Sequence, residues 1–163
     1  MTLVPSDSGA LDFSDVTSPS TGVRRVNIPA AYNNTITLNE NNTGSFTVGV
    51  AATSTAAWAV AQAGSGQSDA VTVSFGSAAT GSSPITATSI ESLTLAGGTA
   101  AAGTLTLGSV SLTDGAGTQT VTITNAGNVA FTTGSATITA DTVTATGVAG
   151  TFGTSALPLV LAN

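Results

Sequence analysis

The chain has 163 residues, of which 41% are hydrophobic and 6% are charged. The apolar fraction is enough for a core and argues against general disorder, although soluble domains usually carry about 25% charged residues. Two arginines against eight acids give a net charge of −6. This balance argues against nucleic-acid binding and against adhesion to anionic membranes, because both need clustered cations.

The first thirty residues differ from the rest. They hold both arginines, three of the five prolines and only scattered apolar residues. We predict an extended N-terminal arm over 1–30 with one short strand around Val23 to Ile28, and a disordered tail is the alternative. The start of the chain has neither the basic residues nor the apolar run of a signal peptide, and no stretch approaches the roughly 18 apolar residues of a membrane helix.

From residue 31 onward, short runs alternate apolar and polar residues with the period of a half-buried strand. Gly, Asn, Asp and Ser separate the runs, and strands recur about every ten residues. This spacing predicts an all-β domain over 31–163, an antiparallel β-sandwich of immunoglobulin-like or jelly-roll type. A helix over the Ala-rich residues 54–63 is an alternative for that segment only. Strands are predicted at residues 45–51, 56–62, 70–76, 104–108, 109–114, 120–124, 128–132, 135–140, 142–146 and 156–162.

One stretch breaks the alternation. In "TLGSVSL" the inward set slips by one residue at Gly108–Ser109, which predicts a β-bulge or a corner between two strands. The fragments "LTLAGG", "LTLGS" and "LTDGAG" look repetitive, but their spacing drifts. No solenoid is predicted from them.

Threonine takes the outward positions of many expected strands. It is β-branched, favours the pleated surface and adds a hydroxyl without charge. Burying a hydroxyl that finds a partner costs little, whereas burying a charge costs much. Such a surface therefore favours packing against other copies or a lattice, with compositional drift as the alternative. A flat threonine array also suits ice binding, but the irregular repeat argues against one here.

The segment "TLTLGSVSLTDGAGTQTVTITNAGNVAFTTGSATITA", Thr104 to Ala140, resembles the middle of immunoglobulin-like modules in bacterial and viral surface proteins. In those modules a strand of this type leads through an Asn-Gly-Asn turn to a short apolar strand and a further Thr-rich strand. The resemblance implies a sandwich, a role in assembly or adhesion, and no catalytic residues. The Cys pair of antibody domains is absent.

Reactive side chains are scarce. The chain has no His and no Cys, which excludes His- or Cys-based triads and zinc sites with N and S ligands, and it has no Lys for a P-loop. Asp12 and Asp15 lie together in the arm, while the other acids are isolated in sequence. No catalytic residue, metal or cofactor is expected. Tyr32 and Trp58 form a minor candidate for a sugar-stacking platform.

These observations predict a non-enzymatic structural assembly protein. We expect a virion component of a tailed bacteriophage, a capsid decoration (cement) or related outer protein, whose partners are copies of itself and a shell protein. Its arm is expected to contact the neighbour through Phe13, Arg24, Arg25 and Ile28, with the arginines pairing to acids. An extracellular filament or pilus subunit that assembles by donor-strand exchange is the alternative, and a glycan-binding module is the third hypothesis. Neither nucleic-acid binding nor membrane insertion is expected.

Overall fold

The computed structural model of the protein is all-β. It describes residues 2–5, 9–13, 25–39, 46–50, 56–63, 69–75, 84–97, 104–113, 117–125, 128–131, 137–146 and 160–162. Within these ranges the secondary structure is sixteen strands and no α-helix. It follows that the described part contains no helix of the length and apolarity needed to cross a membrane.

The strands form two seven-stranded sheets and one small sheet, and every pair is parallel. Sheet A contains, in spatial order, β1 (Thr2–Leu3), β3 (Arg25–Ile28), β5 (Phe46–Val50), β7 (Ala70–Phe75), β9 (Ser92–Ala96), β12 (Thr120–Thr124) and β15 (Thr142–Thr146). Sheet B contains β2 (Leu11–Phe13), β4 (Thr35–Asn39), β6 (Trp58–Ala63), β8 (Ile85–Thr88), β11 (Val110–Thr113), β14 (Thr137–Thr139) and β16 (Val160–Ala162). Sheet C pairs β10 (Thr104–Leu107) with β13 (Asn128–Phe131).

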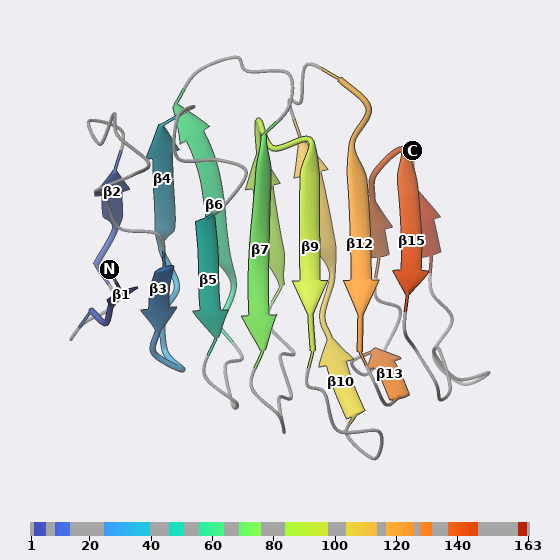
Figure 1. Cartoon of the computed structure of the whole chain (residues 1–163), viewed down its shortest axis with the longest axis horizontal. Helices are drawn as coiled ribbons and strands as arrows, with labels where there is room; N and C mark the ends of the chain where they lie inside the picture. Colours follow the sequence, from blue (N-terminus) through green and yellow to red (C-terminus); the bar gives the residue numbers. More distant parts are fainter. Residues whose placement is uncertain are drawn as a thin grey trace.

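The chain is a β-solenoid. From each strand of sheet A the chain passes to sheet B, in two coils by way of a strand of sheet C, and the next strand of sheet A then pairs with the previous one. Figure 1 shows the result: sheet A lies in front, sheet B lies behind it with its strands running the other way, and the chain advances from one end of the stack to the other. Each coil buries its apolar side only by stacking on its neighbours.

The predicted antiparallel sandwich is therefore wrong, including the sandwich implied by the immunoglobulin-like resemblance. Each predicted strand overlaps an observed one, although residues 156–159 of the last prediction lie outside the described residues. Residues 58–63 form β6 rather than a helix. A turn in this protein leads to the opposite sheet, whereas a hairpin turn leads to the adjacent strand of the same sheet. Alternating apolar residues and turn-forming residues have the same pattern in both cases.

The predicted absence of a solenoid is also wrong, and the register explains the error. Val26, Val48, Val73, Leu95 and Ile123 stack in one inward column of sheet A. The steps along this column are 22, 25, 22 and 28 residues. The variation lies in the connections between strands, so the sequence repeat drifts while the strands stay aligned.

The slip at Gly108–Ser109 is a corner between two strands, as one of the two predictions had it. β10 before the corner belongs to sheet C and β11 after it belongs to sheet B. Because β13 pairs with β10, the following coil has the same third side. The longest step in the inward column, from Leu95 to Ile123, spans the first appearance of this extra strand.

The core fills the space between the sheets. Both sheets direct their alternate apolar residues into it, so that Val48, Leu95 and Leu38 are fully buried. The predicted extended arm is not seen in the described residues before residue 31, because β1, β2 and β3 are the first strands of sheets A and B. The predicted short strand around Val23 to Ile28 corresponds to β3. Phe13 of β2 packs on Phe46 of β5, with ring centroids 5.9 Å apart and the rings tilted by 48°.

Candidate functional site

The outer face of sheet A carries an unbroken row of threonines. Thr47, Thr72, Thr94, Thr122 and Thr144 occupy the same register position on five adjacent strands, from β5 to β15. We call these five residues the threonine column. Along each strand, the threonine alternates with buried apolar residues that point into the core. The alternation that builds the core therefore also places one threonine hydroxyl per coil on the outer face.

Further hydroxyls lie beside this column at neighbouring register positions. Ser92, Thr120 and Thr142 stack two residues before it, and Ser74 and Thr124 lie two residues after it, with Ala96 between them. Adjacent strands are about 4.7–4.9 Å apart, and residues two apart along a strand are separated by about 6.6 Å. The strands of sheet A lie side by side in Figure 1, and their register arranges these residues in rows and columns, which we call the grid.

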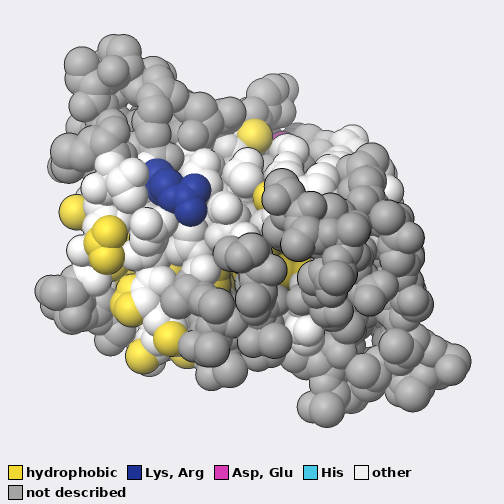
Figure 2. All heavy atoms as spheres, turned by 60° about the horizontal axis from the view of Figure 1, so that its bottom comes forward, with side chains coloured by type: hydrophobic (Ala, Val, Ile, Leu, Met, Phe, Trp, Pro, Cys, Tyr) yellow, Lys and Arg dark blue, Asp and Glu magenta, His cyan; other side chains and the backbone are white. Residues whose placement is uncertain are grey.

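A hollow lies at the N-terminal end of the same face. It has a volume of about 360 Å³ and is lined by Val4, Arg25, Asn27, Ile28, Pro29, Gly49, Val50 and Ser74. Arg25 shares the register position of the threonine column and precedes Thr47. Figure 2 shows its positive charge as one dark blue patch among mostly uncharged side chains.

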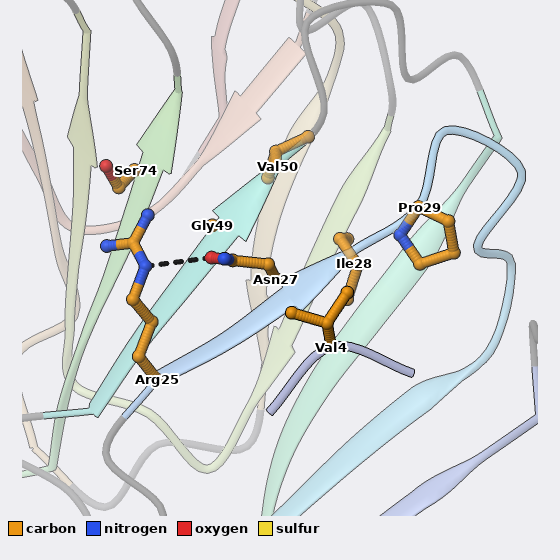
Figure 3. A pocket seen from close by; sticks show the side chains of 8 residues that line it. All are labelled: Val4, Arg25, Asn27, Ile28, Pro29, Gly49, Val50 and Ser74. Atoms are coloured by element: carbon orange, nitrogen blue, oxygen red, sulfur yellow. Dashed lines mark hydrogen bonds between the residues drawn. The ribbon is translucent and has the colours of Figure 1, made fainter. Parts of the chain in front are cut away.

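Arg25 is held in a defined orientation. Its Nε donates a hydrogen bond of 2.8 Å to Oδ1 of Asn27, and the guanidinium lies over Gly49 in the direction of Ser74 (Figure 3). A Cβ at Gly49 would lie 2.6 Å from Nη2 of Arg25 and would also collide with the Asn27 amide. The absence of a side chain at Gly49 therefore provides the space that the Arg25 and Asn27 side chains occupy.

No family model matches the chain, and neither a curated protein nor a solved structure matches it. Its function is therefore inferred from the residues themselves.

The residues predicted to contact a partner lie in different places. Arg25 is half-buried at the hollow, whereas Arg24 lies outside the described residues. Ile28 is buried in the core and also lines the hollow, and Phe13 packs inside the solenoid against Phe46. Of the four, Arg25 is the one whose polar group the structure places at the surface.

Tyr32 and Trp58 lie in the interior. Tyr32 is fully buried and Trp58 is 3% exposed. The Tyr32 hydroxyl donates a hydrogen bond of 3.0 Å to the Thr35 carbonyl oxygen. Burial raises the pKa of this hydroxyl above its ordinary value of 10.0, and a backbone hydrogen bond with Leu11 lowers the pKa in smaller measure. Because a ring must be exposed to stack on a sugar, the glycan-binding hypothesis is not carried further.

Polar residues that are isolated in sequence follow one another along one corner of the solenoid, from coil to coil. Asp69, Glu91, Gln119 and Asp141 each immediately precede a strand of sheet A. The Asp69 N–H donates to Oε2 of Glu91 at 2.9 Å, and the Gln119 N–H donates to Oδ2 of Asp141 at 2.8 Å. These carboxylates bind backbone groups of the adjacent coil, which is a structural role. Within the described residues, no three His, Cys, Asp or Glu side chains come together as a metal site.

Proposed function

We propose that this protein is a non-enzymatic structural protein that assembles through the ends of its two parallel sheets. The observation that supports this most directly is strand β15, a five-residue edge strand that no other strand of the described residues covers. An edge strand presents unpaired N–H and C=O groups to any chain that can add a further strand.

The alternation of backbone groups identifies which residues of β15 face outward. The N–H of Thr142 donates to the carbonyl oxygen of Gln119, the residue just before β12, at 3.0 Å. Because successive residues of a parallel strand direct these groups to opposite neighbours, Val143 and Ala145 point theirs away from β12. The outer edge is thus a row of main-chain donors and acceptors beside an uncharged Thr-rich face.

The two ends of the solenoid are different surfaces. The edge at the N-terminal end is formed by the two-residue strand β1 and the three-residue strand β2, and the opposite edge by β15 and β16. A contact between unlike ends is heterologous and repeats in one direction unless a rotation closes it. Each added copy would continue both sheets in the parallel sense.

Such growth is compatible with the predicted virion component, in which copies pack on one another and on a shell. It also favours the second candidate, an extracellular filament subunit, because a heterologous contact between unlike ends builds an open fibre. A closed oligomer that attaches to a shell would favour the virion, and long fibres would favour the filament.

The proposal is tested by removing a single main-chain donor from the outer edge of β15. Ala145→Pro removes an outward N–H from β15, and proline is tolerated on an edge strand when its missing N–H faces outward. Ala145→Val is the matched control because it keeps the N–H and adds a β-branched side chain. Light scattering after size-exclusion chromatography, over a range of concentrations, measures the assembly, and negative-stain electron microscopy shows its form.

We expect the wild type and Ala145→Val to assemble and Ala145→Pro to stay smaller, with equal melting temperatures. A wild type that remains monomeric at every concentration, both alone and with a shell, would contradict the proposal. Assembly that is equal in all three proteins would exclude the β15 edge as the contact.

A further inference from the structure

We propose that the outer face of sheet A binds ice, with the threonine column and its flanking hydroxyls as the binding surface. The ligand is the ordered water of a crystal face, so the surface needs a regular grid of hydrogen-bonding groups rather than a pocket. This activity is separate from the proposed assembly at the sheet ends, because it uses side chains on the face and not the main chain of the edge.

The grid is regular because the backbone sets both of its repeats. The parallel register places Thr72, Thr94 and Thr122 opposite one another at the spacing of adjacent strands. Along β12, Thr120, Thr122 and Thr124 repeat at every second residue. Threonine is also stiff at χ1, so the hydroxyls keep the order of the backbone. Ice presents water oxygens in a similar two-dimensional repeat.

The irregular sequence repeat argued against ice binding, because it predicted that the threonines would not align. The structure shows that they do align. The step between equivalent residues of sheet A varies from 22 to 28 residues, yet the strands pair in continuous register. The extra residues lie in the connections between strands. The face that would meet ice therefore does not carry the irregularity.

The hydroxyls of the threonine column are available to water. On sheet B, the hydroxyls of Thr88 and Thr113 lie 3.3 Å apart and are hydrogen-bonded to each other. Among the described residues, no such bond joins the hydroxyls of the threonine column. Their side chains are half-buried to exposed, so each hydroxyl can bond to a water at the surface.

The face also lacks groups that would hold water in a competing arrangement. From β5 to β15, the described outward residues of sheet A are Thr, Ser, Ala and Gly. A charged side chain is strongly hydrated, and its removal from bulk water is costly. The charge of Arg25 lies at the N-terminal edge of the grid, over Gly49, and not in its middle.

The experiment measures thermal hysteresis and inhibition of ice recrystallisation by the purified full chain. Thr122→Lys places a charged chain in the middle of the grid, and Thr122→Val removes the hydroxyl while keeping the shape. Ser111→Lys is the matched control, because Ser111 is a half-buried outward residue on an inner strand of sheet B. Circular dichroism and thermal melting confirm that each variant is folded.

We expect the wild type to show ice activity, Thr122→Lys to lose it, Thr122→Val to lose part of it, and Ser111→Lys to keep it. A folded wild type without thermal hysteresis or recrystallisation inhibition overturns the proposal. Equal loss in Thr122→Lys and Ser111→Lys also overturns it, since the activity would not belong to sheet A. If the wild type is inactive and Thr122→Lys dissociates an oligomer, the face is a protein interface and the proposal fails.

The failure of this proposal is distinguishable from the failure of the proposed function. Ala145→Pro tests assembly through the main chain of β15, and Thr122→Lys tests the face through a side chain. If both proposals hold, assembly lengthens the grid, and ice activity per chain falls in Ala145→Pro by loss of multivalency.

Discussion

The outer faces of sheets A and B are built on the same core but differ in composition. On sheet A the threonine column runs without interruption through five strands. On sheet B the equivalent columns are broken at β6, where Ala59 and Ala61 stand between threonines, and one column begins at Asp12. Both faces satisfy the requirement of a water-compatible surface, so folding alone does not demand the uniform row on sheet A. The difference therefore marks sheet A as the face on which a function is to be sought.

The largest expected effect tests what the two sheets share. Leu95→Ala on sheet A and Leu112→Ala on sheet B each remove a large buried side chain from the core. We expect each to lower the free energy of unfolding by about 2–5 kcal/mol, since both leave a cavity. Chemical denaturation measures this loss. A large loss for one sheet and none for the other would show that the sheets do not share one core.

Two glycines near the outer face of sheet A differ in what an added methyl group would meet. At Gly97 it would meet a buried side chain, and at Gly49 it would meet the ends of two side chains at the surface. A Cβ at Gly97 would lie 2.5 Å from Oδ1 and 2.8 Å from Cγ of the buried Asn125. We expect Gly97→Ala to cost about 1–3 kcal/mol, as overpacking does. Gly49→Ala is the comparison, because its Cβ meets the ends of the Arg25 and Asn27 side chains, which can move. Equal losses in thermal melts of the two variants would contradict this distinction.

A smaller effect distinguishes the hydroxyls of the two faces. Thr88→Val on sheet B removes the hydrogen bond to Thr113, and we expect it to cost about 0.5–1.5 kcal/mol. Thr94→Val on sheet A removes a hydroxyl without such a bond and should leave the stability nearly unchanged. Denaturant titration of both variants measures the difference. If Thr94→Val costs as much as Thr88→Val, the sheet A hydroxyls are engaged within the fold.

The smallest effect concerns the connection between the sheets, where Tyr32 lies between β3 and β4. The chain has one Tyr, no Cys and no Lys, so Tyr32 is the side chain that titrates between about pH 9 and 12. Its folded pKa is raised above the unfolded value of 10.0, so the stabilisation is complete below pH 10 and is lost as the pH rises through the folded pKa. We expect Tyr32→Phe to abolish this alkaline loss in denaturation midpoints. A loss that persists in Tyr32→Phe would assign it to another group.

The strands and their two sides were predictable, and their partners were not. Alternation predicted that Leu105 and Leu107 share one side of their strand and that Val110 and Leu112 share one side of the next strand. The break in alternation between the two pairs located the corner. The same alternation is produced by a hairpin and by a solenoid coil. The pairing of Val73 with Leu95 depends on how the chain crosses to the other sheet and returns, which no local pattern encodes.

The candidate site was predictable only in its residue type. The abundance of outward threonine indicated an uncharged face, but alignment into one column depends on register between strands 22 to 28 residues apart. The corner residues Asp69 and Glu91 were missed for the same reason. They lie 22 residues apart in sequence, and the coil brings the backbone of one to the carboxylate of the other.

By itself, the sequence determined that the chain is all-β, where most strands lie and which side of each strand is apolar, because side-chain direction alternates within a strand whatever its neighbours. It also determined that the chain has few charges and no His or Cys chemistry. Tertiary structure alone decided that the strands are parallel, that the first thirty residues contribute strands to the sheets and that the threonines align. These features depend on contacts between coils, which form only when each apolar face finds its cover in the next coil.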